Sequence, residues 1–295
     1  MEVKNMPTFT NQAQISYKGI ITNSNVATGE IIEVLSATQN AVLNDYTAGG
    51  EVTYFINLIN TGTTPYTDLT VEDNLGAYEF QPSAGASILL YPLTYVEDSI
   101  HYILNGVEQP APAVTAANGL TLTGITVPAG GTTTLIYQTR TNEDTPLAPG
   151  AAITNTAVIS GGDLGTPLEV SATVTVQNAP LLTIFKSISP RQVPANGQVT
   201  YTFDIRNLGN TATTVEDNVI VLDTFSPILT DITVSYNGAV LSETDYTYSE
   251  LTGEFATNAG VVNVPAATFV QNPVSGAWTA VPGEATLVIT GTIYG

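Results

Sequence analysis

"GEVTYFINLINTG", residues 50–62, is a strand motif that returns as "GQVTYTFDIRNLG", residues 197–209, at a constant offset of 147 residues. The second copy alternates apolar with polar side chains, which is the pattern of a strand with one buried face and one exposed face. Its apolar positions are Val199, Tyr201, Phe203 and Ile205. The motif therefore predicts a duplicated β-domain.

Composition and turn chemistry agree with this interpretation. The chain has 295 residues, of which 43% are hydrophobic and only 11% are charged, so each half can bury a core. Asn-Gly pairs at 105–106 and 237–238 each lie between apolar alternations, and such pairs favour tight β-hairpins. We predict an all-β fold of two tandem immunoglobulin-like β-sandwiches, domain one over residues 35–180 and domain two over residues 181–295.

The two copies differ in how they end. Domain one continues into a closing hairpin, "PGAAITNTAVISGG" (149–162) followed by "LEVSATVTVQ" (168–177). In domain two, "VPGEATLVITGTIYG" (281–295) is matched with "VPAGGTTTLIYQTR" (127–140), and no closing hairpin follows it. Domain two is therefore expected to lack its closing hairpin and to be an incomplete, acceptor sandwich.

A segment that resembles the missing hairpin lies at the other end of the chain. "FTNQAQIS" (9–16) matches "ITNTAVIS" (153–160), and "ATGEIIEVL" (27–35) takes the place of "ATVTVQ" (172–177). We predict that residues 1–34 form a donor hairpin. The side chains expected to enter the groove of an acceptor domain are Phe9, Asn11, Ala13 and Ile15.

An incomplete sandwich leaves unpaired backbone groups that a strand from another chain can complete. Insertion into the next copy is a heterologous contact and propagates as a filament or a ring. We therefore expect a self-assembling structural subunit, with other copies of this chain as its partner and an anchor or tip protein left open. The alternatives are a hairpin folded back into its own domain two, an N-terminal strand lying on domain one, or a monomeric cell-surface adhesin or ligand-binding stalk.

Three further positions are candidates for covalent chemistry. The offset maps Gln39 onto Lys186, while Asp223 follows apolar residues as Asp73 does. Lysine on a first strand, a central acid and asparagine on a closing strand resemble the constellation of autocatalytic isopeptide bonds in Gram-positive pilin and adhesin domains. That resemblance implies an intermolecular bond between Lys186 and Asn11, assisted by Asp223. The plainer alternative is a salt bridge between Lys186 and Asp223.

The strand motifs also resemble a known repeat. "GEVTYFINLINTG", "LTVEDNLG", "VPAGG" and "ITNTAVISGG", with their echoes in the second half, are similar to the bacterial surface repeat called domain of unknown function eleven, an immunoglobulin-like conserved repeat. The resemblance implies an immunoglobulin-like fold, an extracellular location on a cell or spore surface, and no enzymatic role. Within that family the architecture resembles self-assembling subunits of surface or spore filaments.

Other functional classes find little support. A net charge of −20 disfavours binding to nucleic acid and to anionic membranes. There is no cysteine, no calcium-loop spacing and no membrane-length apolar run, so no metal, cofactor or membrane span is expected. His101 is the lone histidine, and an enzyme is not expected. Trp278 is interpreted as packing over the end of domain two, with a ligand-binding anchor as the alternative.

Overall fold

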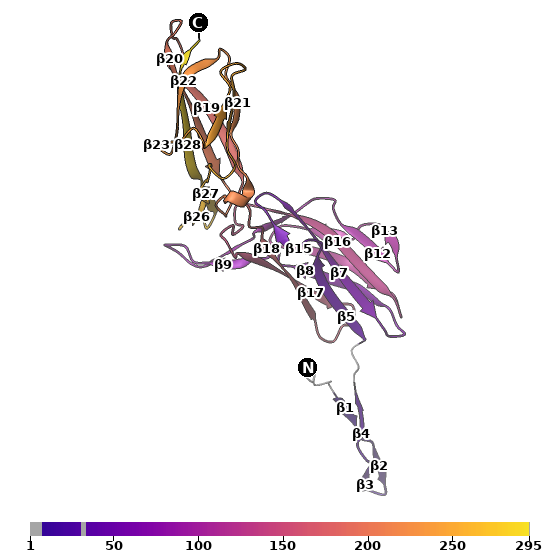
Figure 1. Ribbon diagram of the computed structural model, residues 1–295. Coiled ribbons are helices and arrows are strands. Elements are labelled where there is room, and N and C mark those ends of the chain that lie inside the picture. The colour runs from indigo at the N-terminus through magenta and orange to yellow at the C-terminus, as the bar shows by residue number, and fades with distance from the viewer. Residues whose placement is uncertain (1–7, 31–33, 295) are drawn as a thin grey trace.

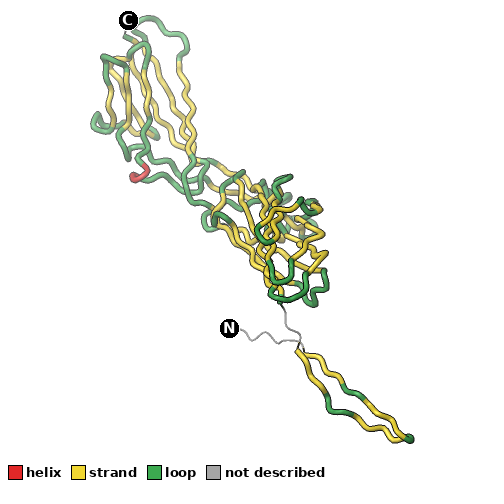
Figure 2. The backbone as a smooth tube through the Cα atoms, turned by 90° about the vertical axis from the view of Figure 1, so that its right-hand side faces the viewer, coloured by secondary structure: helices red, strands yellow, loops and turns green. Residues whose placement is uncertain are grey.

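The computed structural model describes residues 8–30 and 34–294. Residues 1–7 and 31–33 of the predicted donor segment, and Gly295, lie outside the described residues. Figures 1 and 2 show an N-terminal hairpin, domain one and domain two following one another along an elongated molecule. Within the described ranges one 3₁₀ turn, η1 (Val215–Asp217), accompanies the strands, so the all-β prediction is confirmed.

Domain one is a β-sandwich of two sheets around one core, which includes Leu58, Val71 and Leu135 at 0% exposure. The small hairpin of β9 (Tyr78–Phe80) and β10 (Ile88–Leu90) lies outside both sheets. The first sheet contains β13 (Val107–Gln109), β12 (His101–Leu104), β16 (Thr132–Thr141), β7 (Glu51–Asn60) and β5 (Leu35–Ala41), with β11 (Leu93–Tyr95) also on β16. The second contains β14 (Ala113–Thr115), β15 (Leu120–Val127), β8 (Tyr66–Asp73), β17 (Ala152–Gly161), β18 (Leu168–Val176) and β6 (Asp45–Tyr46).

Domain two has a separate and smaller core, which includes Phe203, Phe255 and Leu287. Its main sheet runs β19 (Leu182–Ser189), β20 (Gln198–Asn207), β28 (Gly283–Ile293), β22 (Leu229–Tyr236) and β23 (Ala239–Val240). A short second sheet contains β21 (Leu222–Thr224), β25 (Glu254–Thr257) and β24 (Tyr246–Tyr248). The remaining paired strands are β26 (Thr268–Gln271) with β27 (Trp278–Val281), and β9 (Tyr78–Phe80) with β10 (Ile88–Leu90) in domain one.

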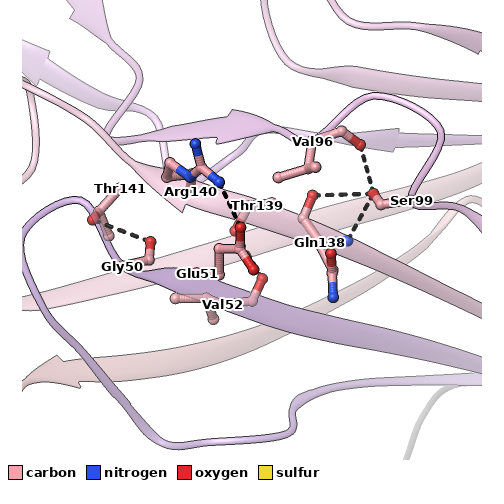
Figure 3. Close-up of polar contacts among 9 residues, drawn as sticks. All are labelled: Gly50, Glu51, Val52, Val96, Ser99, Gln138, Thr139, Arg140 and Thr141. Carbon is pink, nitrogen blue, oxygen red and sulfur yellow. Dashed lines mark hydrogen bonds and ion pairs between the residues drawn. The ribbon is translucent and has the colours of Figure 1, made fainter.

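The central pair β7 and β16 shows how the sequence pattern is used. Both strands alternate buried and more exposed residues along their length, as period-two strands with one core face must. On the exposed face the Arg140 guanidinium lies 2.6 Å from the Glu51 carboxylate (Figure 3). At the edge of β16, the hydroxyl of the loop residue Ser99 bonds to the backbone of Val96 and Gln138 (Figure 3). Apolar packing on one face and cross-strand polar contacts on the other fix the register.

Equivalent hydrogen bonds occur at matching positions of the two domains. The Asn60 side chain donates to the Thr64 carbonyl (2.8 Å) and accepts from the backbone N–H of Gly62 (2.9 Å). In domain two, the Asn207 side chain donates to the Thr211 carbonyl (2.7 Å) and accepts from the backbone N–H of Gly209 (2.9 Å). The Asn-Gly turns are also conserved between the copies, because both residues of each pair have positive φ, as a type I′ hairpin requires.

One detail of the sequence match is wrong. The Gly130 N–H donates to the Gly62 carbonyl, and the equivalent bond in domain two runs from Ala267 to Gly209. The segment "VPAG" at 127–130 therefore corresponds to residues 264–267 and not to 281–284. Hairpin β26–β27 is inserted between this turn and β28, and the repeated dipeptide Val-Pro before β28 concealed the insertion.

The insertion also corrects the interpretation of Trp278. Its indole N–H donates to the Tyr78 hydroxyl (3.3 Å), and its backbone N–H donates to the Glu143 carbonyl (2.7 Å). Both partners belong to domain one. Trp278 therefore packs against domain one and not over the end of its own domain, because the inserted hairpin crosses the domain joint.

Two separate cores imply two separable unfolding events. Leu58 and Ile205 occupy equivalent positions and are 0% and 3% exposed. We expect Leu58→Ala to destabilise domain one, and Ile205→Ala domain two, each by about 2 to 5 kcal/mol. Amide hydrogen exchange followed by peptide mass spectrometry should show faster exchange in β7 for the first variant and in β20 for the second. Equal acceleration in both domains would show one cooperative unit instead.

Candidate functional site

The closed edge of domain one shows what a complete sandwich requires. Strand β8 pairs with β15 along one edge and with β17 along the other, and β18 then pairs with β17. Every second residue of β17 enters the core: Ile153, Asn155, Ala157 and Ile159 are at most 2% exposed. The closing hairpin thus satisfies the backbone of β8 and covers the apolar face beneath it.

A buried polar cluster lies under this hairpin. The Asp73 Oδ2 atom accepts hydrogen bonds from the Gln39 amide (3.0 Å), the Asn155 amide (2.9 Å) and the Tyr137 hydroxyl (2.5 Å). The other carboxylate oxygen accepts from the backbone N–H of Leu75 (2.9 Å). Strands β5, β8, β16 and β17 therefore meet at one carboxyl group.

The carboxyl group of Asp73 has a raised pKa. Burial raises its pKa from 3.8 to about 6, although the four hydrogen bonds that it accepts act in the opposite direction. The Gln39 Oε1 atom is buried without a hydrogen-bond partner among the described residues. Turning this amide over would let Oε1 accept a hydrogen bond from a protonated Asp73 carboxyl, because amide orientations follow from the hydrogen-bond network. Both observations are consistent with a neutral acid in a dry site.

Domain two presents the same edge without a cover. Strand β21 pairs with β25 on one side, and within the described ranges no strand pairs with its other side, where β17 would lie. The first strand is uncovered as well: Ile184 is 57% and Ile188 39% exposed, whereas the equivalent Ala37 and Ala41 are half-buried. Domain two therefore combines an unpaired backbone edge with an exposed apolar face.

Lys186 and Asp223 lie at the centre of this open face. The Lys186 ammonium forms an ion pair with the Asp223 carboxylate, and their side chains are 38% and 16% exposed. Aromatic rings surround the ammonium, with centroids at 4.6 Å for Tyr201, 5.3 Å for Phe225 and 5.4 Å for Phe203. The pair occupies the positions of Gln39 and Asp73, since Lys186 pairs with Phe203 as Gln39 pairs with Ile56.

One member of the domain-one cluster has no polar counterpart. Tyr137 lies opposite Tyr54, and Ile289 lies opposite the equivalent Tyr201. Ile289 is fully buried and cannot donate a hydrogen bond. Sequence reasoning missed Tyr137, because a tyrosine at a core position of a strand gives no signal of a polar role. In domain two the acid therefore has a lysine in place of glutamine and an isoleucine in place of Tyr137.

The N-terminal hairpin reproduces the pairing of the closing hairpin. It contains β1 (Thr8–Asn11), β2 (Gln14–Tyr17), β3 (Ile20–Asn23) and β4 (Ala27–Glu30). Asn11 lies opposite Ala27, as Asn155 lies opposite Ala172. The next pairs, Thr10 with Thr28 and Thr154 with Thr173, also correspond. The two hairpins thus share residues and register at the position of the asparagine.

The side chains of the N-terminal hairpin are exposed where their counterparts are buried. Phe9 is 57% and Ile15 68% exposed, and Asn11 and Ala13 are also exposed. The Phe9 ring lies over Gly29, where an added Cβ would be 2.3 Å from the ring. This large-on-small pair replaces the Ile153–Val174 pair of domain one.

The predicted site residues do not all meet within one molecule. Lys186 and Asp223 are in contact, whereas Asn11 belongs to the hairpin at the opposite end of the elongated chain (Figure 1). The triad of positions is assembled only in domain one, as Gln39, Asp73 and Asn155. The roles predicted for Phe9, Asn11, Ala13 and Ile15 stay predictions.

Other candidate chemistry is sparse in the part of the chain that the structure describes. His101 and Glu108 form an exposed cross-strand pair at 2.7 Å. No group of His, Cys, Asp and Glu side chains that could hold a metal ion is found among these residues. No helix there is long and apolar enough to cross a membrane.

Comparison with known proteins does not identify a family. No protein-family model and no curated protein matches the chain, so membership of the surface-repeat family stays a prediction. Three solved structures with weak similarity have TM-scores below 0.5, at which no common fold is defined. The major pilin subunit of Bacillus cereus has a TM-score of 0.35 at 13% identity, over 94% of this chain and 73% of that chain.

The other two structures are longer proteins. The pilus backbone of Streptococcus pneumoniae has a TM-score of 0.33 at 11% identity, over 84% of this chain. A family 123 glycoside hydrolase from Clostridium perfringens has a TM-score of 0.31 at 9% identity, over 50% of this chain. The chain spans 55% of the pneumococcal protein and 28% of the hydrolase.

The raised pKa of Asp73 makes the stability of domain one depend on pH. Folded domain one keeps this proton up to about pH 6, while the unfolded chain loses it near 3.8. Stability should therefore be greatest below this range and fall by about 3 kcal/mol as pH rises through it. Asp73→Asn should remove this component. The test is the free energy of unfolding of domain one in urea, followed by hydrogen exchange in β7, for the wild type and for Asp73→Asn between pH 3.8 and about 6. The same dependence on pH in the wild type and the variant would contradict the prediction.

Proposed function

We propose that the chain is the structural subunit of an extracellular filament that grows by donating its N-terminal hairpin to domain two of the next copy. The observation that carries this proposal is the matched pair of an exposed hairpin and an open edge. At Thr10 and Asn11 the hairpin has the register of β17–β18, and β21 offers the backbone that β17 would pair with. Each supplies what the other lacks.

Donation would satisfy backbone and core at once. With the register of domain one, Ala13 pairs with Asp223 and Ile15 with Val221, as Ala157 and Ile159 pair with Asp73 and Val71. The apolar face around Ile184 would then be covered as in domain one. Burying such surface contributes roughly 25 cal/mol per Å², and pairing the open edge removes unsatisfied N–H and C=O groups.

The positions of the N-terminal hairpin and of the open edge of domain two favour donation to another copy over insertion within the same molecule. Domain one separates the N-terminal hairpin from domain two along the molecule (Figures 1 and 2). A hairpin donated to a second copy places that copy's domain two before the donor's domain one. The contact is heterologous, so it propagates from subunit to subunit. The resemblance of the strand motifs to the bacterial surface repeat supports a location on a cell or spore surface.

We propose in addition that donation is locked by a covalent bond. Asn11 would take the place of Asn155, whose amide lies 2.9 Å from the acid, and would face Lys186. Water exclusion favours the neutral amine and the neutral acid over the ion pair. The Lys186 nitrogen would attack the side-chain carbonyl carbon of Asn11 and form a new C–N bond. The original amide C–N bond breaks, and a lysine proton relayed through Asp223 leaves with the nitrogen as ammonia.

Domain one shows why the same bond is not expected there. The position of the amine is occupied by Gln39, whose amide nitrogen is a hydrogen-bond donor to Asp73 and Tyr137 and is not a nucleophile. The domain nevertheless keeps the acid and Asn155 in contact. The reactive combination is therefore confined to the joint between two copies.

A cysteine pair tests donation and its register. Gln14 and Leu222 are both exposed and are the counterparts of Val158 and Glu72, which lie opposite each other in domain one. Opposed residues of antiparallel strands lie within disulfide range, and the chain has no other cysteine. We expect Gln14→Cys with Leu222→Cys, combined with Lys186→Arg to prevent the isopeptide bond, to give an oxidation-dependent ladder of multimers on denaturing gels.

The matched control moves one cysteine to Thr247, which is exposed on β24 and separated from β21 by β25. This variant should give no ladder, and deletion of residues 1–34 should leave subunits that do not polymerise. A disulfide within single subunits would show a self-closed monomer. Filaments that persist after the deletion would exclude hairpin donation.

Mass spectrometry of boiled, SDS-denatured filaments tests the covalent bond. We expect a peptide that joins Lys186 to Asn11 and is lighter by one ammonia than the sum of its parts. Lys186→Arg should abolish this peptide and the resistance to boiling while filaments still form, because the guanidinium keeps the charge and is not nucleophilic. Wild-type filaments that separate into intact subunits would remove the bond and leave donation standing.

A further inference from the structure

The joint between domain one and domain two is held by two hairpins that reach toward each other. Hairpin β9–β10 projects from domain one and hairpin β26–β27 from domain two, and we call this pair the clasp. The Ser83 N–H, in the β9–β10 turn, donates to the Pro273 carbonyl at 2.7 Å. Gly276 packs so closely on Leu90 and Phe80 that an added Cβ would lie 2.4 Å from Leu90. The turns of the two hairpins are therefore in direct contact.

Polar contacts at Tyr78 complete the clasp. Its hydroxyl accepts hydrogen bonds from the Gln271 amide and from the Trp278 indole, both at 3.3 Å. The Trp278 backbone N–H donates to Glu143 at 2.7 Å. Beside the clasp, Asn210 binds the connecting segment, because its side chain accepts from the Ala179 N–H (3.2 Å) and donates to Asn178 (3.1 Å).

A pocket of about 370 Å³ that is open to solvent lies between the bodies of the two sandwiches. Its lining includes Thr47, Leu147, Val176, Pro180, Leu208 and Phe269. Because side chains do not fill this space, the angle at the joint is fixed mainly by the clasp and by Asn210.

Neither half of the clasp has a counterpart in the other domain. Strands β15 and β16 of domain one are joined by residues 128–131, where domain two inserts β26–β27. Strands β21 and β22 of domain two are joined by residues 225–228, where domain one inserts β9–β10 between β8 and β11. The counterpart of Asn210 is Thr63, which has no side-chain amide.

A filament built as proposed contains two kinds of joint. Within a subunit, domain one precedes domain two and the clasp closes. Between subunits, domain two of one copy precedes domain one of the next. The hairpins that form the clasp then lie at the ends of these domains that point away from the joint, so they cannot meet. We infer that each subunit is a rigid rod and that the filament bends at the joints between subunits. This inference rests on the proposed head-to-tail polymerisation.

The inference assigns a role to Trp278 and Tyr78 that is independent of donation. They lie on the clasp and far from the donated hairpin and from β21. Removing them should loosen the joint within the subunit and leave polymerisation unchanged. Val274, at the turn of the same hairpin, provides a matched control, because its side chain is 69% exposed.

Cryo-electron microscopy of single filaments tests the inference by measuring the angle at every joint between successive sandwiches. In wild-type filaments we expect a narrow spread of angles at every second joint and a severalfold broader spread at the joints between. Tyr78→Ala with Trp278→Ala should broaden the narrow class until the two are equal, whereas Val274→Ala should leave both unchanged.

The possible failures are distinguishable. Wild-type filaments with the same spread at both kinds of joint, or a Tyr78 and Trp278 variant with an unaltered narrow class, would overturn the rigid-rod inference and leave donation intact. A wild-type chain that forms no filament would overturn the proposed function, and with it the joint between subunits. Hydrogen exchange in β20 and β28 should confirm that the double variant keeps domain two folded.

Discussion

The need to pair the free edge of strand β8, or of its counterpart β21, governs the architecture of this chain. Backbone N–H and C=O groups at such an edge need partners, and the apolar face beside the edge needs a cover. In domain one the closing hairpin of β17 and β18 meets both needs. In domain two, within the described residues, neither is met, while a hairpin that shares the register of β17–β18 at its asparagine lies exposed at the far end of the molecule.

The two domains show the same site in two states. Closure in domain one buries Asp73 and brings the amides of Gln39 and Asn155 onto it. In domain two the equivalent acid is partly exposed and is ion-paired with Lys186. An ion pair is tolerated at a partly exposed site and is costly in a dry one. Covering domain two therefore changes the electrostatics of the pair as well as the packing.

The sequence predicted the duplication, the all-β fold and the exchange of Gln39 for Lys186, because strand periodicity and a constant offset are local properties. It could not reveal the clasp, since β9–β10 and β26–β27 match no repeat and their contacts join residues far apart in the chain. The repeated Val-Pro before β28 hid the second insertion. The polar role of Tyr137 was missed because the alternation of its strand already accounts for a tyrosine at a buried position. The predicted packing of Trp278 was wrong because the hairpin that carries it was not recognised as an insertion.

The hairpin and the open edge lie at opposite ends of the molecule (Figure 1), which gives any string of such subunits polarity. One terminus would present a free hairpin and the other a vacant sheet edge, so the two termini differ in chemistry. A protein that anchors the string at the first terminus must provide an acceptor sandwich. A protein that caps the second must provide a strand, so no single capping surface could serve both.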